Sequence, residues 1–203
     1  MLTPRTIFAS LAVALLCITS AAVARADTIV FTGSRDFSGG APGAPDVGQC
    51  GPAPPNVLSI HPLGTGASNL GAFTSTERQC INVATGNIFN GQFTFNFGGG
   101  NAFSGTYVGT VALPLPPPTG TAAVSFIYTV TGGTGIFVNA SGTLLGTGTT
   151  TFAPPPTGTS SHVDIRGTIT TVPEPATLLL LGAGLTGVVA GARRRHKPTG
   201  NTG

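Results

Sequence analysis

Apolar and polar side chains alternate in the middle of the chain, and this alternation predicts β-strands. Phe93, Phe95 and Phe97 are separated by polar residues. The same period of two recurs in two later runs: Val124, Phe126, Tyr128 and Val130, then Val163, Ile165, Gly167 and Ile169. Successive side chains of a strand point to opposite faces, so a period of two indicates strands with one buried face. We therefore predict an all-β fold, either an antiparallel β-barrel or a β-sandwich.

Glycine and proline divide this pattern into segments. A short β-branched run, Thr28 to Thr32, precedes residues 39–55, which are rich in both residue types and predict a loop. Two proline clusters, residues 114–118 and 154–156, predict further loops between strands or at exposed edges. A long amphipathic helix pattern is absent between residues 27 and 171.

A weak internal repeat predicts two similar hairpins. Residues 98–103, Gly-Gly-Gly-Asn-Ala-Phe, are echoed by residues 132–137, Gly-Gly-Thr-Gly-Ile-Phe. In each copy we expect an aromatic residue, Phe103 or Phe137, to pack under a glycine-rich turn. The second copy has a three-residue insertion, residues 138–140, which we place in a loop or bulge because it would disturb the strand register.

Residues 131–143 also resemble a hairpin of small antiparallel barrels related to allene oxide cyclase and dirigent proteins. The resemblance extends over residues 92–151 and implies a barrel rather than a sandwich. Only turn glycines, Phe137 and Ala140 match, and these are structural positions, so no catalytic role is carried over. Convergent Gly-Thr hairpins are the alternative explanation.

An uncharged apolar run, residues 176–192, lies near the end of the sequence. As a helix it would be about 25 Å long, close to the lower limit for crossing a bilayer. The basic residues that follow it, Arg193, Arg194, Arg195 and Lys197, favour the cytoplasmic side and place the preceding residues outside. We therefore predict a C-terminal transmembrane helix at about residues 176–192 with a basic tail.

This segment resembles the PEP-CTERM sorting signal of bacterial envelope and exopolysaccharide-associated proteins. Pro173, Glu174 and Pro175 match the Pro-Glu-Pro triplet, residues 177–192 match the helix, and Arg193, Arg194 and Arg195 match the basic cap. The resemblance implies that an exosortase cuts near the triplet and releases the preceding chain toward the outer surface. An ordinary membrane anchor that is never cut is the alternative.

The first 26 residues predict a secretory signal peptide. Arg5 precedes an apolar stretch from Ile7 to about Ile18, and Ala24 and Ala26 form a small-x-small cleavage site. The Sec machinery and signal peptidase are the implied partners. We therefore divide the chain into a signal peptide (1–26), a Gly- and Thr-rich β domain (27–171) and a sorting signal (172–203), so that a signal helix and a transmembrane helix flank the β domain.

Removing these end segments reverses the charge of the protein. The whole chain has a formal net charge of +3, but residues 27–171 contain three basic residues, Arg35, Arg78 and Arg166. They are outnumbered by five acidic residues, Asp27, Asp36, Asp46, Glu77 and Asp164. The β domain is therefore slightly acidic, and a nucleic-acid partner has no electrostatic support.

Cys50 and Cys80 are the cysteines of the β domain. In an exported protein such a pair usually forms a disulfide, which here would close a loop of about 30 residues and stabilise the fold by roughly 3 kcal/mol. A metal site or a catalytic thiol would need companion residues, and His61 and His162 are isolated in sequence. We therefore predict the Cys50–Cys80 disulfide.

The remaining candidates for chemistry do not form a recognisable site. The carboxylates of Asp36, Asp46, Glu77 and Asp164 are each expected on the solvated surface. His162 and Asp164 would share one strand face, but with no third group evident we expect an exposed polar face there. We thus predict no catalytic, cofactor-binding or metal-binding residues.

The sequence favours an exported, non-catalytic protein of the cell envelope or extracellular matrix. In this hypothesis the chain is transiently anchored in the inner membrane, is sorted by exosortase, and associates with surface exopolysaccharide. An alternative is a β-barrel module that binds a glycan, an apolar small molecule or ice, through its interior or through a face bearing Thr147, Thr149 and Thr151. A barrel isomerase or hydrolase is the third hypothesis.

Overall fold

Nine antiparallel strands make up most of the described residues, which in this computed structural model are 26–39, 47–51, 56–112, 120–152, 158–172 and 184. The strands are β1 (Asp27–Gly39), β2 (Val57–Ile60), β3 (Leu63–Ser68), β4 (Gly71–Asn82), β5 (Asn87–Asn96), β6 (Ala102–Val111), β7 (Gly120–Thr134), β8 (Ser141–Phe152) and β9 (Thr159–Thr171). Two short helical turns accompany them, α2 (Val47–Cys50) and η1 (Gly135–Phe137). The predicted all-β class is confirmed.

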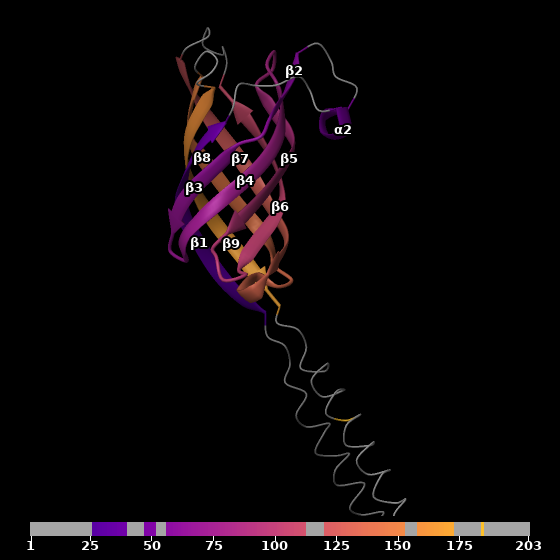
Figure 1. The fold of residues 1–203 in the computed structure, drawn as a ribbon, viewed down its shortest axis with the longest axis vertical. Helices are drawn as coiled ribbons and strands as arrows, with labels where there is room; N and C mark the ends of the chain where they lie inside the picture. Colours follow the sequence, from indigo (N-terminus) through magenta and orange to yellow (C-terminus); the bar gives the residue numbers. More distant parts are fainter. Residues whose placement is uncertain are drawn as a thin grey trace, which may run out of the picture. The chain divides into compact units, whose positions relative to one another are not determined.

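The sheet closes on itself, which decides between the two predicted architectures. Its strand order is β2-β4-β3-β1-β9-β8-β7-β6-β5, and an additional pairing of β4 with β5 completes an eight-stranded barrel (Figure 1). The short strand β2 pairs with the end of β4, and β3 pairs with its beginning, so together they fill one position in the wall. The described sheet is a closed barrel and not a sandwich.

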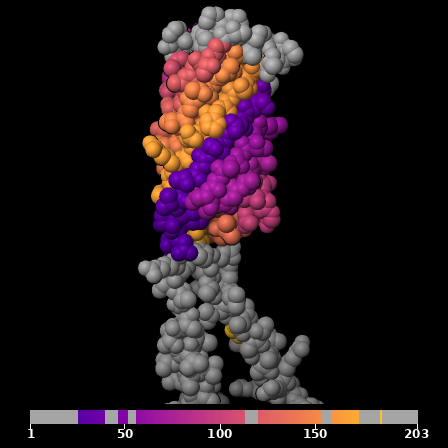
Figure 2. Space-filling view, turned by 90° about the vertical axis from the view of Figure 1, so that its left-hand side faces the viewer, coloured from indigo at the N-terminus to yellow at the C-terminus, as the bar shows by residue number. Residues whose placement is uncertain are grey.

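The two ends of the barrel chain meet in one strand pair. β1 and β9 pair along their whole lengths, from Asp27 opposite Thr171 to Gly39 opposite Thr159. β1 continues well beyond the β-branched run Thr28–Thr32 from which it was predicted. Figure 2 shows β1 crossing the outer surface diagonally between β9 and β3, which is the strand tilt that barrel closure requires.

Glycines allow neighbouring strands to approach closely in this tilted wall. A Cβ atom on Gly148 would collide with the backbone oxygen of His162, and one on Gly105 would collide with the backbone oxygen of Thr129. Glycine inside a strand often marks such a bend or close approach. Part of the glycine content therefore serves barrel curvature.

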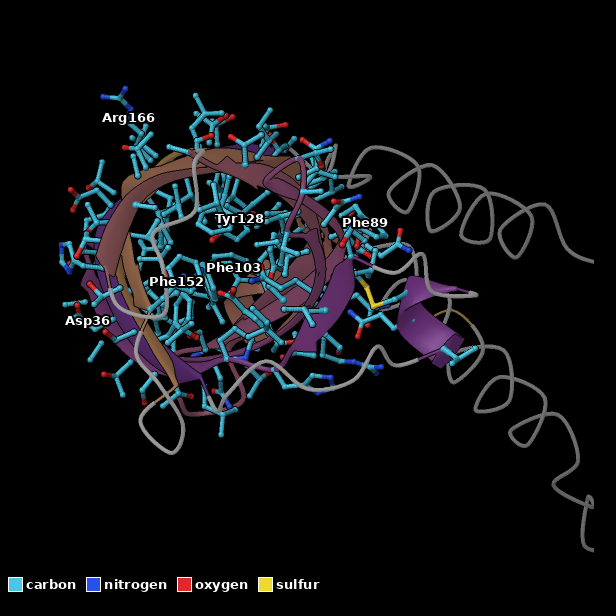
Figure 3. The ribbon with its side chains drawn as sticks, turned by 90° about the horizontal axis from the view of Figure 1, so that it is seen from above. Asp36, Phe89, Phe103, Tyr128, Phe152 and Arg166 are labelled. Carbon is cyan, nitrogen blue, oxygen red and sulfur yellow. A yellow bond between two sulfur atoms is a disulfide. The ribbon has the colours of Figure 1, made fainter. Side chains whose placement is uncertain are left out.

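Aromatic and aliphatic side chains fill the interior. The predicted inward positions of β5, β7 and β9 are confirmed: Phe93 and Phe95 are buried, as are the apolar members of the later runs. Phe97 follows β5 and is partly buried against the core. Figure 3 shows Phe103, Tyr128 and Phe152 inside the wall, and Asp36 and Arg166 outside it.

The repeated segments form the turns at one end of the barrel. The β5–β6 turn contains Gly98, Gly99 and Gly100, all with positive φ. Phe103 and Phe137 are fully buried and their ring centroids lie 5.1 Å apart, so both aromatic residues pack under the turns as predicted. The insertion at residues 138–140 lies in the β7–β8 connection, also as predicted. Gly132 and Gly133, however, belong to β7 itself.

The predicted disulfide is confirmed. Cys50 and Cys80 are bonded, and their Cα atoms lie 5.7 Å apart. The bond joins α2 to β4 on the outside of the barrel, where the two cysteines pack with Val57 and Phe89. The segment predicted as a loop thus contains the single turn α2, and Gly39 is the last residue of β1.

Several predicted features lie outside the described residues. They are the signal peptide with Ala24, the proline clusters at 114–118 and 154–156, Asp46, the triplet Pro173, Glu174 and Pro175, the helix at 176–192 apart from Gly184, and Arg193, Arg194 and Arg195. In the described part of the chain, no helix has the length and apolar character needed to cross a membrane.

Candidate functional site

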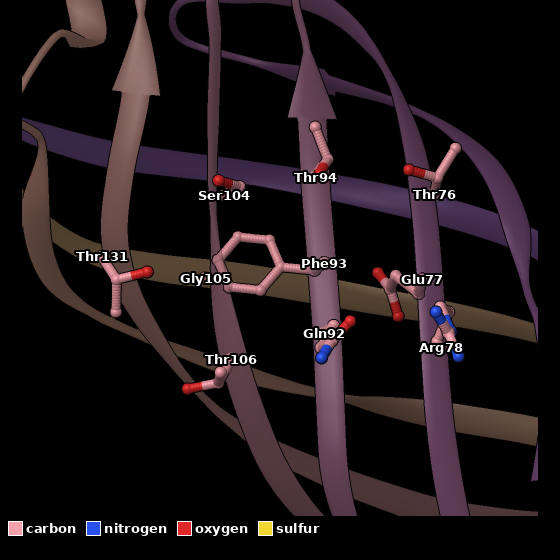
Figure 4. Close-up of a pocket in the computed structure, with 10 residues that line it drawn as sticks. All are labelled: Thr76, Glu77, Arg78, Gln92, Phe93, Thr94, Ser104, Gly105, Thr106 and Thr131. Carbon is pink, nitrogen blue, oxygen red and sulfur yellow. The ribbon is translucent and has the colours of Figure 1, made fainter. Parts of the chain in front are cut away.

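Two adjoining hollows lie on the outer wall of the barrel. The first, of about 390 Å³, is lined by residues of β4, β5, β6 and β7 (Figure 4). The second, of about 530 Å³, is lined by β4, β5, β6 and the helical turn α2. Arg78, Gln92 and Thr106 line both hollows, which therefore form one continuous depression that we call the outer-wall groove.

Irregular strand pairing gives the groove its shape. The register of β5 against β6 shifts between Ile88 and Gly91, and Asn90 within this bulge has a positive φ of 50°. Two more shifts interrupt the β4–β5 pairing between Arg78 and Cys80 and the β6–β7 pairing between Ser104 and Gly105. Bulges bend a strand and redirect its side chains, which breaks the even surface of the wall.

The helical turn α2 forms one rim of the groove and is held by several contacts. Asn90 Nδ2 donates to the backbone oxygen of Gln49 at 3.0 Å, and Gln49 Nε2 donates to the backbone oxygen of Asn90 at 3.1 Å. Arg78 Nε donates to Gln49 Oε1 at 3.3 Å. Together with the Cys50–Cys80 bond, these contacts fix Gln49 beside Arg78.

Most of the exposed side chains that line the groove are polar. Exposed Arg78, Gln92 and Thr106 face it, whereas Phe93 and Tyr107 contribute to the floor from buried positions. Glu77 also lines the first hollow, but its side chain is 1% exposed and pairs with Arg35 inside the barrel. The lining residues thus offer one cation, amides, hydroxyls and the exposed apolar side chain of Val108, with no exposed carboxylate among them.

Inside the barrel, Arg35 and Glu77 form a buried ion pair. Arg35 Nη2 lies 2.9 Å from Glu77 Oε2 and donates to Tyr128 Oη at 2.9 Å. Tyr107 Oη donates to Gln79 Oε1 at 3.0 Å. The guanidinium also lies over the Phe37 ring, 4.8 Å from its centroid, a cation–π geometry.

The expectation that Glu77 lies on the surface is wrong. β4 alternates between exposed and buried positions from Ala72 to Gln79, and its inward positions there are Phe73, Ser75, Glu77 and Gln79. Because three of these four are polar, hydrophobic alternation does not reveal the strand. The sequence also did not predict that Arg35 is buried. Arg35 is an even number of residues from Phe31 and Phe37 on β1, so it lies on the same face of the strand, and this spacing could have located it.

Burial controls the ionisation of this cluster. Desolvation raises the pKa of Glu77 above its ordinary value, and the nearby charge of Arg35 only partly opposes this effect. Desolvation also raises the pKa of Tyr128. For Arg35, burial acts to lower the pKa, but the charge of Glu77 and the two tyrosine hydroxyls outweigh it and raise the pKa.

Several buried polar atoms of this cluster have no hydrogen-bond partner within the described structure. Arg35 Nε and Nη1 and Glu77 Oε1 are buried without a hydrogen-bond partner. A neighbouring cavity, lined by Gln79, Phe126 and Ser161 among others, measures about 20 Å³. That volume is about what one water molecule needs.

On the outer face, the structure supplies the third group that the sequence did not show for His162. Its Nδ1 lies 2.7 Å from Asp36 Oδ1 on the neighbouring strand β1, and its Nε2 lies 3.8 Å from Asp164 Oδ1. The imidazole is 53% exposed. Among the described residues, no group of three His, Cys, Asp or Glu side chains has the geometry of a metal site.

This pairing predicts a measurable shift of the His162 pKa. The hydrogen bond to Asp36 raises it above its ordinary value. Because the folded-state pKa is the higher one, the stabilisation is present below the unfolded pKa of about 6.5 and is lost as the pH rises through the folded-state value. NMR titration of the full chain should show this raised pKa.

Asp36→Asn should bring the His162 pKa back toward 6.5, whereas Asp164→Asn, at the longer distance, should have the smaller effect. An unchanged pKa in Asp36→Asn would contradict the assignment.

The threonines predicted to form a binding face do lie on the exterior. Thr147, Thr149 and Thr151 are exposed on β8. The hydroxyls of Thr151 and Thr121 are hydrogen-bonded across strands at 3.0 Å. The hydroxyls of Thr110 and Ser125 pair in the same way at 2.9 Å. The outer wall of β6 to β8 therefore presents ordered hydroxyl groups.

Comparison with known proteins adds one match. The PEP-CTERM protein-sorting motif matches residues 171–195, which include the triplet, the apolar run and the arginine cluster. No curated protein and no solved structure shows significant similarity to the chain. The chain therefore carries a PEP-CTERM protein-sorting motif, and this motif implies an exported protein with a membrane-anchored sorting signal that an exosortase processes.

Proposed function

We propose that the barrel is a non-catalytic component of the cell envelope or extracellular matrix that associates with surface exopolysaccharide. In this proposal signal peptidase removes the chain up to Ala26, and exosortase cuts near Pro173, Glu174 and Pro175. The mature protein is then the β domain of residues 27–171. The cell surface or matrix is its final location.

The positions of the first and last strands support the proposed processing at both ends. β1 begins at Asp27, and β9 ends at Thr171, which pairs with Asp27. Both proposed cuts therefore fall outside the outermost strand pair. Removal of both targeting segments would leave every strand of the described barrel intact.

The packing of the interior argues against a catalytic site inside the barrel. A catalytic site needs titratable groups that a substrate can reach. The buried pair Arg35 and Glu77 is enclosed by aromatic side chains, and the adjacent cavity of about 20 Å³ is too small for a substrate. Association through the outer surface fits the geometry better than binding of an apolar molecule inside.

Cell fractionation tests this proposal with the full chain. In cells that have the exosortase, we expect a processed protein in the matrix fraction. Replacing Pro173, Glu174 and Pro175 together by Ala should leave a longer, membrane-bound form, because the processing site is lost. The exposed substitution Thr32→Ala serves as the matched control and should be processed normally.

A strain that makes no exopolysaccharide tests the association itself. There the processed protein should move from the matrix fraction to the culture medium. The proposal is wrong if the chain stays cytoplasmic, keeps its anchor in the presence of exosortase, or remains equally surface-bound without the polysaccharide.

A further inference from the structure

We propose that the end of the barrel around Val172 is a docking surface for the exosortase, and that Asn139 is a positioning residue for the cut. This role rests on the proposed processing near Pro173, Glu174 and Pro175, and adds that the folded barrel takes part in it. It follows from the short distance between the barrel and the triplet, the contact of Asn139 with Val172 and the anchored turn that carries Asn139.

The sorting motif begins inside the barrel. The motif matches residues 171–195, so its first residue, Thr171, is also the last residue of β9. Thr171 is 7% exposed and pairs with Asp27. Only Val172 separates this last paired residue from the Pro-Glu-Pro triplet. The sequence therefore provides no linker between the folded domain and the processing segment.

An enzyme that cuts near the triplet has to approach the barrel closely. Four steps along the chain lead from Val172 to the first residue of the apolar run, and fully extended they span at most about 14 Å. Even a domain of 100 residues has a radius of gyration of about 13 Å. An enzyme of that size or larger reaches the triplet only by touching the end of the barrel or by opening the end of β9.

Asn139 holds the residue that precedes the triplet. Its Nδ2 donates to the backbone oxygen of Val172 at 3.3 Å, while the Val172 residue is 38% exposed. Ser141 pairs with Thr170, so the β7–β8 connection lies directly beside the end of β9. The backbone is thus held in place up to Val172, and Val172 remains accessible to a partner.

Asn139 lies in the segment that distinguishes the two repeated hairpins. The three-residue insertion at 138–140 belongs to the second copy, whose connection lies beside β9. Asn139 has a positive φ of 56°, a conformation that asparagine adopts more readily than most residues. The insertion therefore brings an amide donor to the end of β9.

The turn that carries Asn139 is anchored to the barrel. Asn101 Oδ1 accepts a hydrogen bond from the backbone N–H of Ile136 at 3.0 Å, and Phe137 and Ala140 are buried. A chain segment that is already ordered loses less conformational freedom when it binds. Holding a reacting segment close to its bound geometry also raises the rate of reaction. Asn139 is therefore expected to favour the cut.

The chemistry beside Val172 suits a protein partner. Ile136 is 61% exposed, although its backbone is held by Asn101. Residues 135–140 and 171–172 contain no charged side chain. The centres of protein interfaces are depleted of charged residues, so Ile136 and Val172 fit the centre of such a contact. Asp27, opposite Thr171, adds an exposed carboxylate at this end.

Pulse–chase measurement of processing tests this role with the full chain in cells that have the exosortase. Asn139→Asp introduces a residue that also tolerates a positive φ, but its carboxylate cannot donate to Val172. We expect this variant to be cut about 5-fold more slowly, which is the size of effect that one lost hydrogen bond produces.

Asn90→Asp is the matched control. Asn90 is also exposed, has a positive φ of 50°, and donates from Nδ2 to a backbone oxygen of α2 at 3.0 Å. The same chemical change is therefore made on the outer wall, away from β9, and the cut should keep its unaltered rate.

Two further changes separate positioning from loss of folding. A Gly-Ser-Gly-Ser spacer between Val172 and Pro173 leaves the barrel unchanged but frees the triplet from it. The spacer should slow the cut, and Asn139→Asp should then have no additional effect. Ile136→Ser should also slow the cut, whereas Ile127→Ser, on the outer wall of β7, should not. Circular dichroism of each purified chain checks that the barrel is folded.

The role of Asn139 is wrong if Asn139→Asp is cut as fast as the unaltered chain, or if Asn90→Asp slows the cut equally. A spacer that speeds the cut would show that the barrel only obstructs the enzyme, and equal rates for Ile136→Ser and Ile127→Ser would overturn the docking surface. If the unaltered chain is not cut at all, the proposed processing fails as well. If it is cut and Asn139 has no effect, only the role of the barrel end fails.

Discussion

Replacement of Glu77 by Gln is expected to lower the free energy of unfolding by about 3–5 kcal/mol, which is the usual cost of breaking a buried ion pair. The Glu77 carboxylate lies 2.9 Å from Arg35, and both side chains are almost completely buried. Glutamine keeps the volume but removes the charge, so the guanidinium remains inside the barrel without its anion. Urea unfolding of the full chain, followed by circular dichroism, measures the loss.

A double variant distinguishes the loss of the ion pair from the cost of leaving one buried charge without its partner. Arg35→Met with Glu77→Leu removes both charges, and we expect it to cost much less than the sum of the two single changes. Asp164→Asn, an exposed carboxylate on β9, is the matched control and should change stability by less than about 0.5 kcal/mol. Additive costs in the double variant, or an effect of Glu77→Gln no larger than that of the control, would contradict the buried pair.

Phe95→Ala is expected to destabilise the barrel by a similar amount, about 3–5 kcal/mol. The Phe95 ring is fully buried, and its centroid lies 4.9 Å from that of Phe73 and 5.3 Å from that of Phe103. Truncation removes these contacts and leaves a cavity, because rigid neighbouring rings cannot close the space. The change appears as a lower midpoint in urea unfolding.

The size of the replacement gives a graded control for this prediction. Phe95→Leu should cost clearly less than Phe95→Ala, since a smaller cavity remains. Ile127→Ala removes an apolar side chain that is 49% exposed on the outer wall, and its effect should be small. If Phe95→Ala and Ile127→Ala lower the free energy of unfolding equally, the prediction that the buried aromatic side chains stabilise the barrel is wrong.

The sequence predicts which side of a strand faces the interior where the inward side chains are apolar. The alternation around Phe93 and Phe95, and that from Val124 to Val130, identified β5 and β7 and their buried sides correctly. β4 has no such signal because Ser75, Glu77 and Gln79 are polar and point inward. Hydrophobic patterning therefore cannot identify a strand such as β4, whose inward side chains are mostly polar.

The candidate sites depend on contacts between residues that are distant in sequence. Asp36 and His162 meet because β1 pairs with β9, and Arg35 meets Glu77 across the barrel interior. The outer-wall groove combines residues from α2 and four strands, and three register shifts that no sequence pattern predicted interrupt the pairing of these strands. Local spacing carries no information about such register shifts.

The sequence by itself determined the targeting motif, the all-β class, the inward faces of the apolar strands and the cysteine pairing. These properties reside in local order: a triplet before an apolar run and arginines, a period of two, and one cysteine pair in an exported domain. Only the tertiary structure decided that the sheet closes through β4 and β5, that Glu77 is buried, and that Arg78 lies in a groove. Closure and burial depend on which distant strands pair and in which register, and that choice is made by packing of the whole chain.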